Sequence, residues 1–407
     1  MIEDDGHVSN KAGPQSGILI SYVVSDETLD NLKHIDPSPA VQTHRFGLRL
    51  IELLRPIFKE FQSFNFVPVQ DYPVATKWLF RSGYHYREKT LIASLPFINL
   101  LILKHVSRFI ALARNIRPSR VGSVLIVHGL HLPHLLFALL VKLYGVRIGV
   151  VVTDEQGLIL RSDGFMRRLF KRVDRMLAVA LSKRFDFGIA LSEGLAQTYL
   201  PNVSKFVLPG LYDAQLEARV SQVHVTGTRP STFRVLYFGL LLPEYGIRSL
   251  IDAVPFLNSG IEIRIFGRGP LEAEIAEQAQ LYSNLHWGGF VDQDRLVAEM
   301  ATCHLLVNPR PADTELARMS SPSKLVEYAA SGRSILTTRL PSILPSCLRN
   351  MIVIDDHSSA GIASQINAIS RIDPKILREK GRRTQEFMRE HYSPDSVRFE
   401  ILRLCHP

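Results

Sequence analysis

The sequence predicts an α/β protein of two Rossmann-like domains, each built on a parallel sheet. Short apolar runs alternate with segments of helical periodicity, and most of these runs are apolar throughout rather than at every second residue. The alternation occurs in two series separated by a polar stretch, and the length of 407 residues suits about two domains. We expect the two domains to face each other across a cleft.

The first series begins with a strand expected at residues 17–24. The polar segment that follows contains prolines and predicts a loop, and a helix is expected from Thr43 onward, where apolar residues recur at helical spacing. Continuous apolar strands alternating with helices are typical of a parallel sheet covered on both faces. Further strands are expected at 123–129, 146–154, 186–192 and 205–210, with an apolar helix between the first two of these.

The second series begins after residues 214–232, which lose the pattern and are expected to form a linker. The predicted domains are therefore residues 17–213 and 233–390, preceded by a polar, acidic segment, 1–16, that predicts a disordered tail. The strands of the second series are expected at 233–239, 261–269, 285–291, 304–310, 334–339 and 351–356, with helices at 246–257, 270–282, 294–303 and 323–332.

The composition disfavours several classes of protein. No uninterrupted run of about 20 apolar residues predicts a membrane span, and the first residues lack the basic and apolar regions of a secretory signal. The three cysteines are scattered, so we expect no structural metal site or disulfide framework, and a cytoplasmic location fits. The net charge of +9 favours an anionic partner, but the basic residues are not interleaved with aromatic ones as on a nucleic-acid-binding surface.

Ligands of open parallel sheets bind outside the carboxyl ends of the strands. The residues that follow the predicted strands include Asp154, Gly210, Gly239, Gly267 and Arg310. Neither a complete GxGxxG sequence nor a GxxxxGKS loop is present, which disfavours a nicotinamide enzyme and a P-loop ATPase.

The segment SSPSKLVEYAASGRSILTT, residues 320–338, predicts a helix start and, after the helix, a strand. Pro322 suits the first turn of a helix, where free N–H groups and the helix dipole favour an anion. Lys324 adds a full positive charge, Arg310 could form two hydrogen bonds with phosphate oxygens, and Glu327 could accept hydrogen bonds from ribose hydroxyls. The predicted diphosphate site contains Gly239, Gly267, Arg310, Ser320, Ser323, Lys324 and Glu327.

Simpler interpretations stay open for these residues. Lys324 and Glu327 could form only a surface ion pair, Arg310 could be a solvated loop residue, and Asp154 could cap the turn that follows it. The shared position of Arg310, Lys324 and Glu327 at one sheet edge favours the binding site.

The order of these motifs resembles glycosyltransferase family 4, whose members are retaining enzymes with the two-domain GT-B architecture. The strongest matches are VLYFGLLLPEYGIRSLIDAV, IRIFGRGPLEAEI, LHWGGFV, HLLVNPRP and SPSKLVEYAASGRSILTT, all within residues 233–338. Weaker matches in the first half are VVVTDEQG, DFGIALSEGL and KFVLPGLYD. The resemblance implies an acceptor-binding first domain, a donor-binding second domain, and a last helix within 391–407 that crosses back to the first domain.

The sequence departs from the family pattern at three positions. Met319 stands where many members carry the first Glu of a Glu-x7-Glu pair, and Glu327 matches the second, which binds the donor ribose. Leu240 and Tyr245 stand where members carry an arginine and a lysine that hold the donor diphosphate. A branch with similar NPR and SPSKLxEY motifs implies that Arg310 and Lys324 supply the positive charge instead.

The resemblance also implies a front-face substitution without a firm enzyme nucleophile and without a metal ion. The predicted catalytic residues are Asp154, which resembles the polar residue that faces the reacting sugar, and Arg310 and Lys324, which would neutralise the departing diphosphate. The acceptor is expected to lie near His44, Arg45 and Gly47, although His44 alone is more typical of a surface histidine.

Residues 165–186, FMRRLFKRVDRMLAVALSKRFD, predict a basic amphipathic helix. Such a helix could simply cover the sheet with its charged face in water, or it could dock on anionic lipid.

The leading hypothesis is a retaining, metal-independent glycosyltransferase. It would move a sugar from a nucleoside-diphosphate sugar, its donor substrate, to a glycan or lipid-linked acceptor, without a cofactor. An anionic membrane surface is a further candidate partner, and nucleic acid is not. Two alternatives stay open: a sugar-nucleotide epimerase of the same fold, and a non-catalytic scaffold, which the missing basic residues would favour.

Overall fold

The computed structural model describes residues 16–37, 39–87, 90–117, 123–157, 164–223, 232–321 and 323–406. These residues form two compact units. The first unit comprises the described residues up to 190, residues 196–206 and residues from 398 onward, and the second comprises 191–195 and 207–397. Apart from Ser16, the expected N-terminal tail lies outside the described residues, as does Pro322.

The first unit is built on an eight-stranded sheet with the order β10-β9-β8-β7-β1-β2-β5-β4. The ladders that join β9 through β5 are parallel, as predicted, and β4 pairs antiparallel with β5. A separate antiparallel pair joins β3 (Leu79–Phe80) to β6 (Phe97–Ile98). The strands of the large sheet are β1 (Ser16–Ser21), β2 (Glu60–Asn65), β4 (Gly83–Arg87), β5 (Thr90–Ser94), β7 (Ser123–His128), β8 (Arg147–Val152), β9 (Phe187–Ala190) and β10 (Ser204–Val207).

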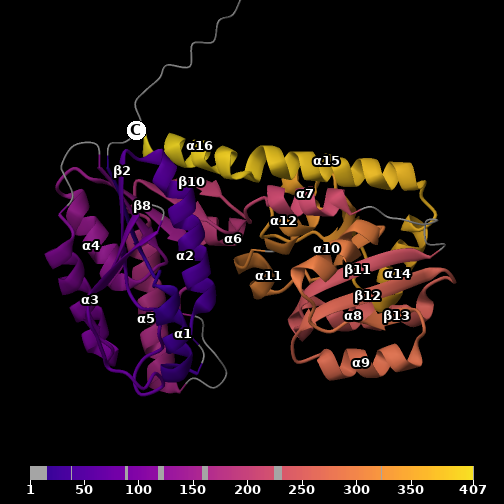
Figure 1. The fold of residues 1–407 in the computed structure, drawn as a ribbon, viewed down its shortest axis with the longest axis horizontal. Helices are drawn as coiled ribbons and strands as arrows, with labels where there is room; N and C mark the ends of the chain where they lie inside the picture. The colour runs from indigo at the N-terminus through magenta and orange to yellow at the C-terminus, as the bar shows by residue number, and fades with distance from the viewer. Residues whose placement is uncertain are drawn as a thin grey trace, which may run out of the picture. The chain divides into compact units, whose positions relative to one another are not determined.

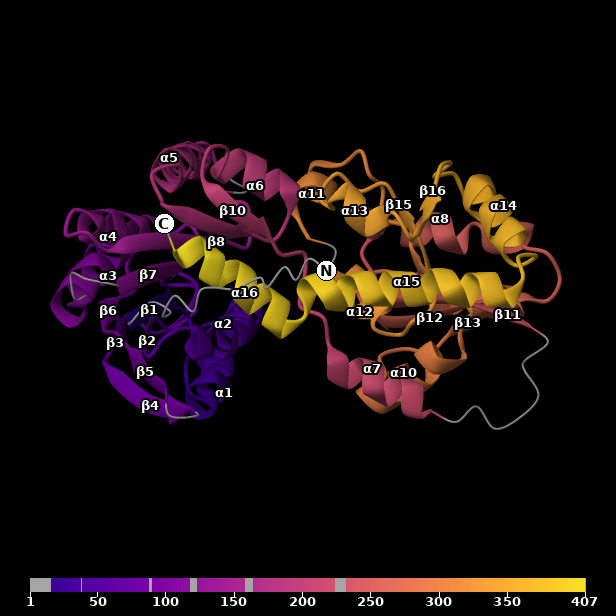
Figure 2. The ribbon, with the colours of Figure 1, turned by 90° about the horizontal axis from the view of Figure 1, so that it is seen from above.

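Helices cover both faces of this sheet. Figure 2 shows α3, α4 and α5 along one side of the unit and α1, α2 and α16 on the other. The helices of this unit are α1 (Asp26–Ile35), α2 (Val41–Leu54), the short 3-10 helix η1 (Arg55–Ile57), α3 (Leu101–Asn115), α4 (Leu132–Lys142) and α5 (Phe165–Ser182), with α6 (Glu193–Tyr199) and α16 (Pro394–Cys405) each shared with the second unit. Two hydrogen bonds from the Arg147 guanidinium to the Leu404 carbonyl, at 3.0 and 3.1 Å, fix the end of α16 to β8.

The prediction of a loop after the first strand is wrong, because part of this segment forms α1. The Ser25 side chain caps the helix by accepting a hydrogen bond from the Thr28 N–H, and Asp26 and Glu27 lie in the first turn, where the helix dipole favours them. Only Leu32 is buried, so the apolar signal that identifies a helix is weak here.

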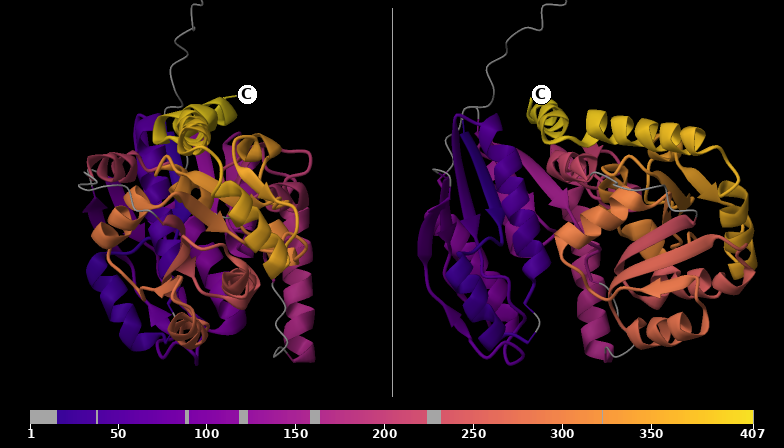
Figure 3. Two further views of the ribbon diagram at one scale, coloured as in Figure 1. Left: turned by 90° about the vertical axis from the view of Figure 1, so that its right-hand side faces the viewer. Right: turned by 45° about the vertical axis from the view of Figure 1, so that its right-hand side comes forward.

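The second unit is built on a six-stranded sheet with the order β13-β12-β11-β14-β15-β16, and all of its ladders are parallel. This is the doubly wound order, in which successive strands are added first on one side and then on the other side of the sheet. The order changes between the two central strands, β11 and β14. Figure 3 shows these strands edge to edge between their helices. The strands are β11 (Phe233–Leu240), β12 (Ile261–Arg268), β13 (Leu285–Trp287), β14 (Leu305–Asn308), β15 (Ser334–Thr338) and β16 (Ile352–Ile354), which confirms the six predicted strands.

Nine α-helices and two 3-10 helices accompany the described part of this sheet (Figure 1). The expected linker is helical in its first half, because Asp213 caps α7 through the Leu216 N–H, while residues 224–231 lie outside the described residues. The helix expected at 246–257 is interrupted, with a 3-10 turn at Pro255. The helices are α7 (Ala214–Gln222), η2 (Pro243–Tyr245), α8 (Ile247–Ile251), η3 (Val254–Phe256), α9 (Glu272–Leu281), α10 (Gln293–Thr302), α11 (Glu315–Met319), α12 (Ser323–Ala329), α13 (Pro345–Leu348), α14 (Ser359–Ile369) and α15 (Pro374–Tyr392).

No helix in the described part of the chain is both long enough and apolar enough to cross a membrane.

Candidate functional site

The predicted donor residues of the second unit meet where β11 and β14 end. Gly239 lies at the end of β11, and the side chain of Lys324, from the first turn of α12, lies over it. A methyl group at Gly239 would stand 2.4 Å from Lys324 Cε and 3.1 Å from Nζ. Glycine is therefore needed at this position for the lysine to reach the switch point of the sheet, where ligands of doubly wound folds bind.

Gly267 pairs with Gly239 across the β11–β12 ladder. Its φ is 145°, and a Cβ there would stand 1.8 Å from the Gly239 carbonyl oxygen. The role of Gly267 in this structure is thus to let the ends of two strands approach, and this approach holds the Gly239 backbone under Lys324.

The positive charge of Lys324 has little compensation nearby. Its ammonium lies 4.0 Å from a Glu327 carboxylate oxygen, at the limit of an ion pair, and 4.9 Å from the centre of the Phe238 ring. Burial lowers the pKa of Lys324, and the Glu327 carboxylate opposes this shift only in part. A partly buried cation with one distant carboxylate favours a further anion beside it.

Arg310 is buried, with 4% of its surface exposed, so the solvated-loop interpretation is wrong. Its Nη2 donates hydrogen bonds to the Leu316 carbonyl, at 2.7 Å, and to the Ser320 hydroxyl. The guanidinium also lies against the Tyr245 ring, 5.0 Å from its centre, while Nε has no hydrogen-bond partner among the described residues. Arg310 therefore holds the 310–320 segment in place, and only part of its donor set is engaged.

The serines at the start of α12 have different roles. The Ser320 hydroxyl donates to the Leu316 carbonyl at 2.9 Å as well as receiving the Arg310 bond. Ser321 donates to the Pro209 carbonyl and thereby ties the 207–210 loop to this helix, and Ser323 is exposed. The structure thus brings together Gly239, Gly267, Lys324 and Glu327, with Arg310 and Ser320 in the supporting loop.

The structure also shows the surroundings of the three residues that depart from the family pattern. Leu240 is 53% exposed and carries no charge to the strand end. The Tyr245 ring contacts the Arg310 guanidinium, so a cation lies beside the position where the resemblance implies a lysine. Met319 is buried, and its carbonyl accepts a hydrogen bond from the Ser192 hydroxyl at 3.0 Å.

In the first unit, Asp154 lies exposed after β8, at the carboxyl edge of the sheet. The loop that follows it is fixed to α5. Glu155 forms a 2.6 Å ion pair with Arg175, and the Gln156 amide donates to Asp174. The Gly157 backbone, at φ 72°, packs on the Lys171 carbonyl, which leaves no room for a side chain.

The acceptor residues predicted at the start of α2 differ in exposure. His44 is 2% exposed, and its Nδ1 accepts a hydrogen bond from the Val24 N–H at 3.3 Å, so the surface-histidine interpretation is wrong. Burial lowers the pKa of His44. Gly47 packs against Ser21 and Val23 after β1, whereas Arg45 is exposed.

The switch point of the first sheet, between β1 and β7, carries residues that the sequence analysis missed. The Ser21 hydroxyl and His128 Nδ1 are hydrogen-bonded at 2.8 Å across the two strand ends. The rings of Tyr22 and His131 lie 4.9 Å apart, and His134 stacks on Phe66 at 5.3 Å. The sequence signal of this cluster is HGLHLPH, residues 128–134, in which His128 belongs to the strand expected at 123–129 and His134 to the apolar helix that follows it.

Arg108, on α3, points into this cluster. It is 5% exposed and lies within 6 Å of the ring centres of Tyr22, Phe66 and Phe97. Its Nε has no hydrogen-bond partner among the described residues, and neither do the Tyr22 hydroxyl and both ring nitrogens of His134. Buried polar groups are usually paired, so this cluster is poised for a polar ligand.

Burial and the surrounding cations keep the histidines of this cluster neutral. Burial lowers the pKa of His128 to about 4. Burial, with the charge of Arg108 as the next cause, lowers that of His131 to about 3. Burial, with His131 and then Arg108 as the next causes, lowers the pKa of His134 well below its usual value.

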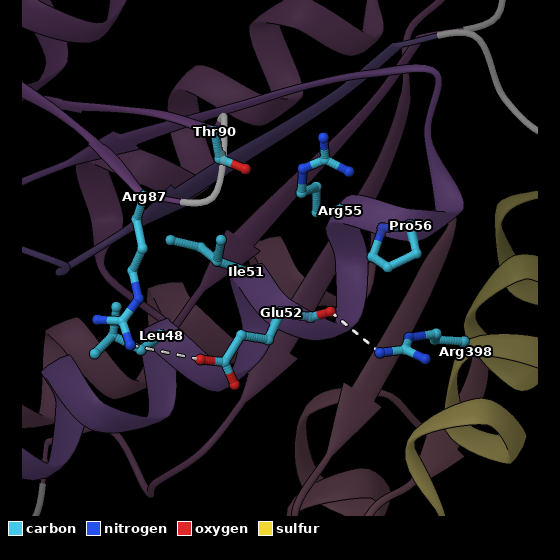
Figure 4. Close-up of a pocket in the computed structure, with 8 residues that line it drawn as sticks. All are labelled: Leu48, Ile51, Glu52, Arg55, Pro56, Arg87, Thr90 and Arg398. Atoms are coloured by element: carbon cyan, nitrogen blue, oxygen red, sulfur yellow. Dashed lines mark hydrogen bonds and ion pairs between the residues drawn. The ribbon is translucent and has the colours of Figure 1, made fainter.

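A pocket of about 310 Å³ lies elsewhere in the first unit, beside the end of α2 and the start of β5 (Figure 4). Because β5 begins there, the pocket is at the amino edge of the sheet, opposite the edge that carries Tyr22 and His128. Arg87 lies 3.8 Å from the Glu52 carboxylate, and Arg398 donates to the Glu52 carbonyl at 3.4 Å. Within the described ranges, no three His, Cys, Asp or Glu side chains cluster as a metal site requires.

Comparison with known proteins identifies the class of the second unit. Residues 232–371 match the family model of glycosyl transferases group 1. A search of the curated proteins found no match.

Solved structures are similar to the chain as a whole in fold. A trehalose-6-phosphate synthase, studied with bisubstrate mimics of glycosyl transfer with retention, is 10% identical, with a TM-score of 0.65 over 96% of this chain and 98% of that one. Sucrose-phosphate synthase from Thermosynechococcus elongatus is 13% identical, with a TM-score of 0.59 over 96% and 98%. S. aureus TarM, in complex with UDP, is 16% identical, with a TM-score of 0.55 over 77% of this chain, which covers 60% of TarM.

The predicted fold class is therefore confirmed. The two parallel-sheet units have the α/β fold of GT-B glycosyltransferases. Residues 232–371 of the second unit match the model of glycosyl transferases group 1, and the Gly239–Lys324 contact lies at the switch point of this region.

Proposed function

We propose that the chain is a retaining, metal-independent glycosyltransferase that uses a nucleoside-diphosphate sugar. The observation that carries the proposal is the Lys324 ammonium over Gly239 at the β11–β14 switch point, with only a distant carboxylate partner. A diphosphate is the anion that this position suits, since it would sit on the strand ends and meet a full positive charge. TarM, a structure of similar fold, contains UDP.

Arg310 supports the donor side indirectly. Its guanidinium lies against Tyr245, the position where the resemblance implies a lysine, and its Nε is unpaired among the described residues. We assign Arg310 to shape the 310–320 segment and to add positive potential, while Lys324 makes the direct contact. Glu327, one turn further along α12, would accept hydrogen bonds from the ribose hydroxyls.

The reaction would be a front-face substitution at the anomeric carbon. The bond between this carbon and the diphosphate oxygen breaks, the acceptor hydroxyl oxygen bonds from the same face, and the departing diphosphate takes the acceptor proton. Lys324 and Arg310 would stabilise the charge that develops on the leaving group. Asp154, on the rigid loop after β8, would orient a sugar hydroxyl.

The acceptor would bind to the first unit near Tyr22, His128 and the start of α2. His44, Arg45 and Gly47 border this edge, and the unpaired Arg108 Nε and Tyr22 hydroxyl offer polar contacts. A glycan offers many hydroxyls to such groups. A lipid-linked acceptor would add an anionic phosphate for Arg108 and would place the enzyme at the cytoplasmic face of a membrane, with α5 as the candidate contact.

Titration of the protein with UDP and GDP by calorimetry tests the donor assignment. Lys324→Met should weaken nucleotide binding about tenfold or more, because a charge-assisted contact contributes about 1.5–3 kcal/mol. Lys375→Met, on α15 of the same unit, is the matched control and should bind as the parent does. Equal affinity of the Lys324→Met and parent proteins would contradict the proposal.

Incubation with a panel of sugar nucleotides separates the alternatives. Slow hydrolysis of one donor with retained anomeric configuration, read by NMR, supports the transferase. Formation of an epimer would support the epimerase, and absence of both binding and turnover would support the scaffold.

A further inference from the structure

The outer face of the helix layer α3–α4–α5 is unusually apolar. Of the 29 large apolar side chains that are exposed among the described residues, sixteen lie on these three helices or directly after α4. They are Leu101, Ile102, Leu103, Val106 and Ile110 on α3; Leu136, Leu140, Leu143 and Tyr144 on and after α4; and Phe165, Met166, Leu169, Phe170, Val173, Met176 and Leu177 on α5. We call this set the apolar face.

The three helices that carry the apolar face are neighbours. Helix α4 packs against β7 and β8 on its inner side and between α3 and α5 on its flanks. The opposite sides of α3 and α4 are buried, so their exposed side chains must point away from the sheet. Figure 3 shows α5 as a straight magenta helix at the edge of the first unit.

The most exposed members are spread over the three helices. Phe165 and Leu143 are each 81% exposed and Ile102 is 68% exposed, at positions where polar residues are more common. Large exposed apolar patches mark surfaces that bind a partner or a membrane. The apolar stripe of α5 is thus in water along much of its length.

Several cations of these helices are engaged within the first unit. Lys104, Lys142 and Arg175 form ion pairs with Asp71, Asp186 and Glu155, and Arg108 is buried. The acidic residue of α5, Asp174, accepts a hydrogen bond from the side-chain amide of Gln156. Arg114 and Arg172 are exposed beside the apolar face.

This combination favours one kind of partner. An anionic bilayer offers hydrocarbon to the sixteen apolar residues and, in the adjacent layer, phosphate to the exposed Arg114 and Arg172. The exposed Trp78 lies close to this layer, since its carbonyl accepts a hydrogen bond from the Asn99 N–H just before α3, and tryptophan favours the membrane–water interface.

We propose that the α3–α4–α5 face docks the protein on an anionic lipid bilayer, with α5 lying in the interface and Arg114 and Arg172 contacting headgroups. The membrane would then be a partner of the glycosyltransferase proposed above. Docking would be useful because a lipid-linked acceptor lies in the membrane. Docking itself requires neither donor nor acceptor, so the two proposals can fail separately.

Co-sedimentation with vesicles tests this inference on the full chain. Vesicles of phosphatidylcholine with one-third phosphatidylglycerol should bind the protein, and pure phosphatidylcholine should bind it at least tenfold more weakly. The triple variant Phe165→Ser/Phe170→Ser/Met176→Ser should lose about tenfold or more in partition coefficient. Arg114→Glu/Arg172→Glu should lose about 30-fold, since each cation near the surface contributes about 1 kcal/mol, and this loss should shrink at high salt.

The matched control is Phe256→Ser/Leu281→Ser/Ile376→Ser, three exposed apolar residues of the second unit, which should bind vesicles as the parent does. Calorimetry with UDP and GDP on every variant verifies that the donor unit is intact, so a loss of vesicle binding with unchanged nucleotide binding supports the inference. Equal binding of the Phe165 triple variant and the parent would overturn it. So would a lipid-free dimer that the same triple variant abolishes, because the apolar face would then cover a second copy of the chain.

Discussion

Each unit holds a buried arginine at the switch point of its sheet, but the two arginines have different surroundings. Arg310 donates hydrogen bonds to Leu316 and Ser320 of its own chain, whereas Arg108 is surrounded by three aromatic rings and its Nε has no partner among the described residues. A buried cation that is hydrogen-bonded supports the structure around it. One that lacks such bonds costs stability unless a ligand supplies them.

The two arginines differ in role: one supports a loop of its own unit, and the other is available to bind a ligand. In the second unit the residue available for an anion is Lys324, and Arg310 holds the loop beside it. In the first unit the cation itself is available, and the hydrogen bonds around it join other groups, such as Ser21 and His128. The four predictions below test this difference, from the largest expected effect to the smallest.

Gly267→Ala should have the largest effect, because its methyl group would stand 1.8 Å from the Gly239 carbonyl oxygen and the backbone conformation is strained for alanine. We expect a loss of more than about 3 kcal/mol in the free energy of unfolding. Gly47→Ala in the first unit meets only the Ser21 and Val23 side chains and gains helix propensity, so it should cost much less. Urea unfolding of both variants measures the contrast, and similar losses would contradict it.

Exchanging each arginine for methionine should sharpen the comparison. Arg310→Met removes the charged hydrogen bonds to the Leu316 carbonyl and the Ser320 hydroxyl and should cost about 3 kcal/mol. Arg108→Met removes an unpaired buried charge and should leave stability unchanged or raise it, while it weakens acceptor binding. Thermal unfolding measures the first effect and the acceptor KM the second; a strongly destabilised Arg108→Met protein would show that Arg108 is structural.

Acid should weaken the first unit through its histidines. Since His128 has a pKa of about 4 when folded and about 6.5 when unfolded, the unfolded chain takes up a proton near pH 6 that the folded chain does not. Between pH 7 and pH 5 this one residue should remove about 2 kcal/mol of stability. Denaturant unfolding of the parent and of His128→Gln measures the slope with pH, and an unchanged slope in the variant would refute the assignment.

Gly239→Ala should destabilise the protein less than Gly267→Ala and should clearly weaken nucleotide binding. Its backbone, at φ 152°, is strained for alanine, but its methyl group would meet the flexible end of Lys324 rather than the backbone, so the ammonium should be displaced from the strand end. We expect about a tenfold loss of UDP or GDP affinity, equivalent to about 1.4 kcal/mol. Calorimetry at a temperature below the unfolding transition of the variant provides the measurement, and full affinity would argue against Lys324 as the anion contact.

Much of the second unit could be predicted from the sequence because its strands are continuous apolar runs. All six are confirmed, and the motif around Lys324 and Glu327 placed these residues at the correct sheet edge. The sequence did not reveal that Arg310 would be hydrogen-bonded to Leu316, because this bond depends on the turn into α11, a five-residue helix whose signal is short.

The first unit was harder to predict for identifiable reasons. Helix α1 is polar and buries only Leu32, and β4 is antiparallel and largely exposed, so neither carries the continuous apolar signal of a parallel strand or a core helix. Arg108 lies within an apolar helix without a motif. Its proximity to Tyr22 and Phe97 depends on contacts between elements far apart in the sequence, which a single sequence does not report.

The assignment of residues from 398 onward to the first unit has a consequence for synthesis. The Leu404 carbonyl accepts two hydrogen bonds from Arg147, and Arg398 donates to the Glu52 carbonyl, so these earlier segments obtain their partners only after α16 has been translated. A premature stop just before α16 should therefore damage the first unit, and a nascent chain on the ribosome should hold this unit incomplete until α16 has emerged.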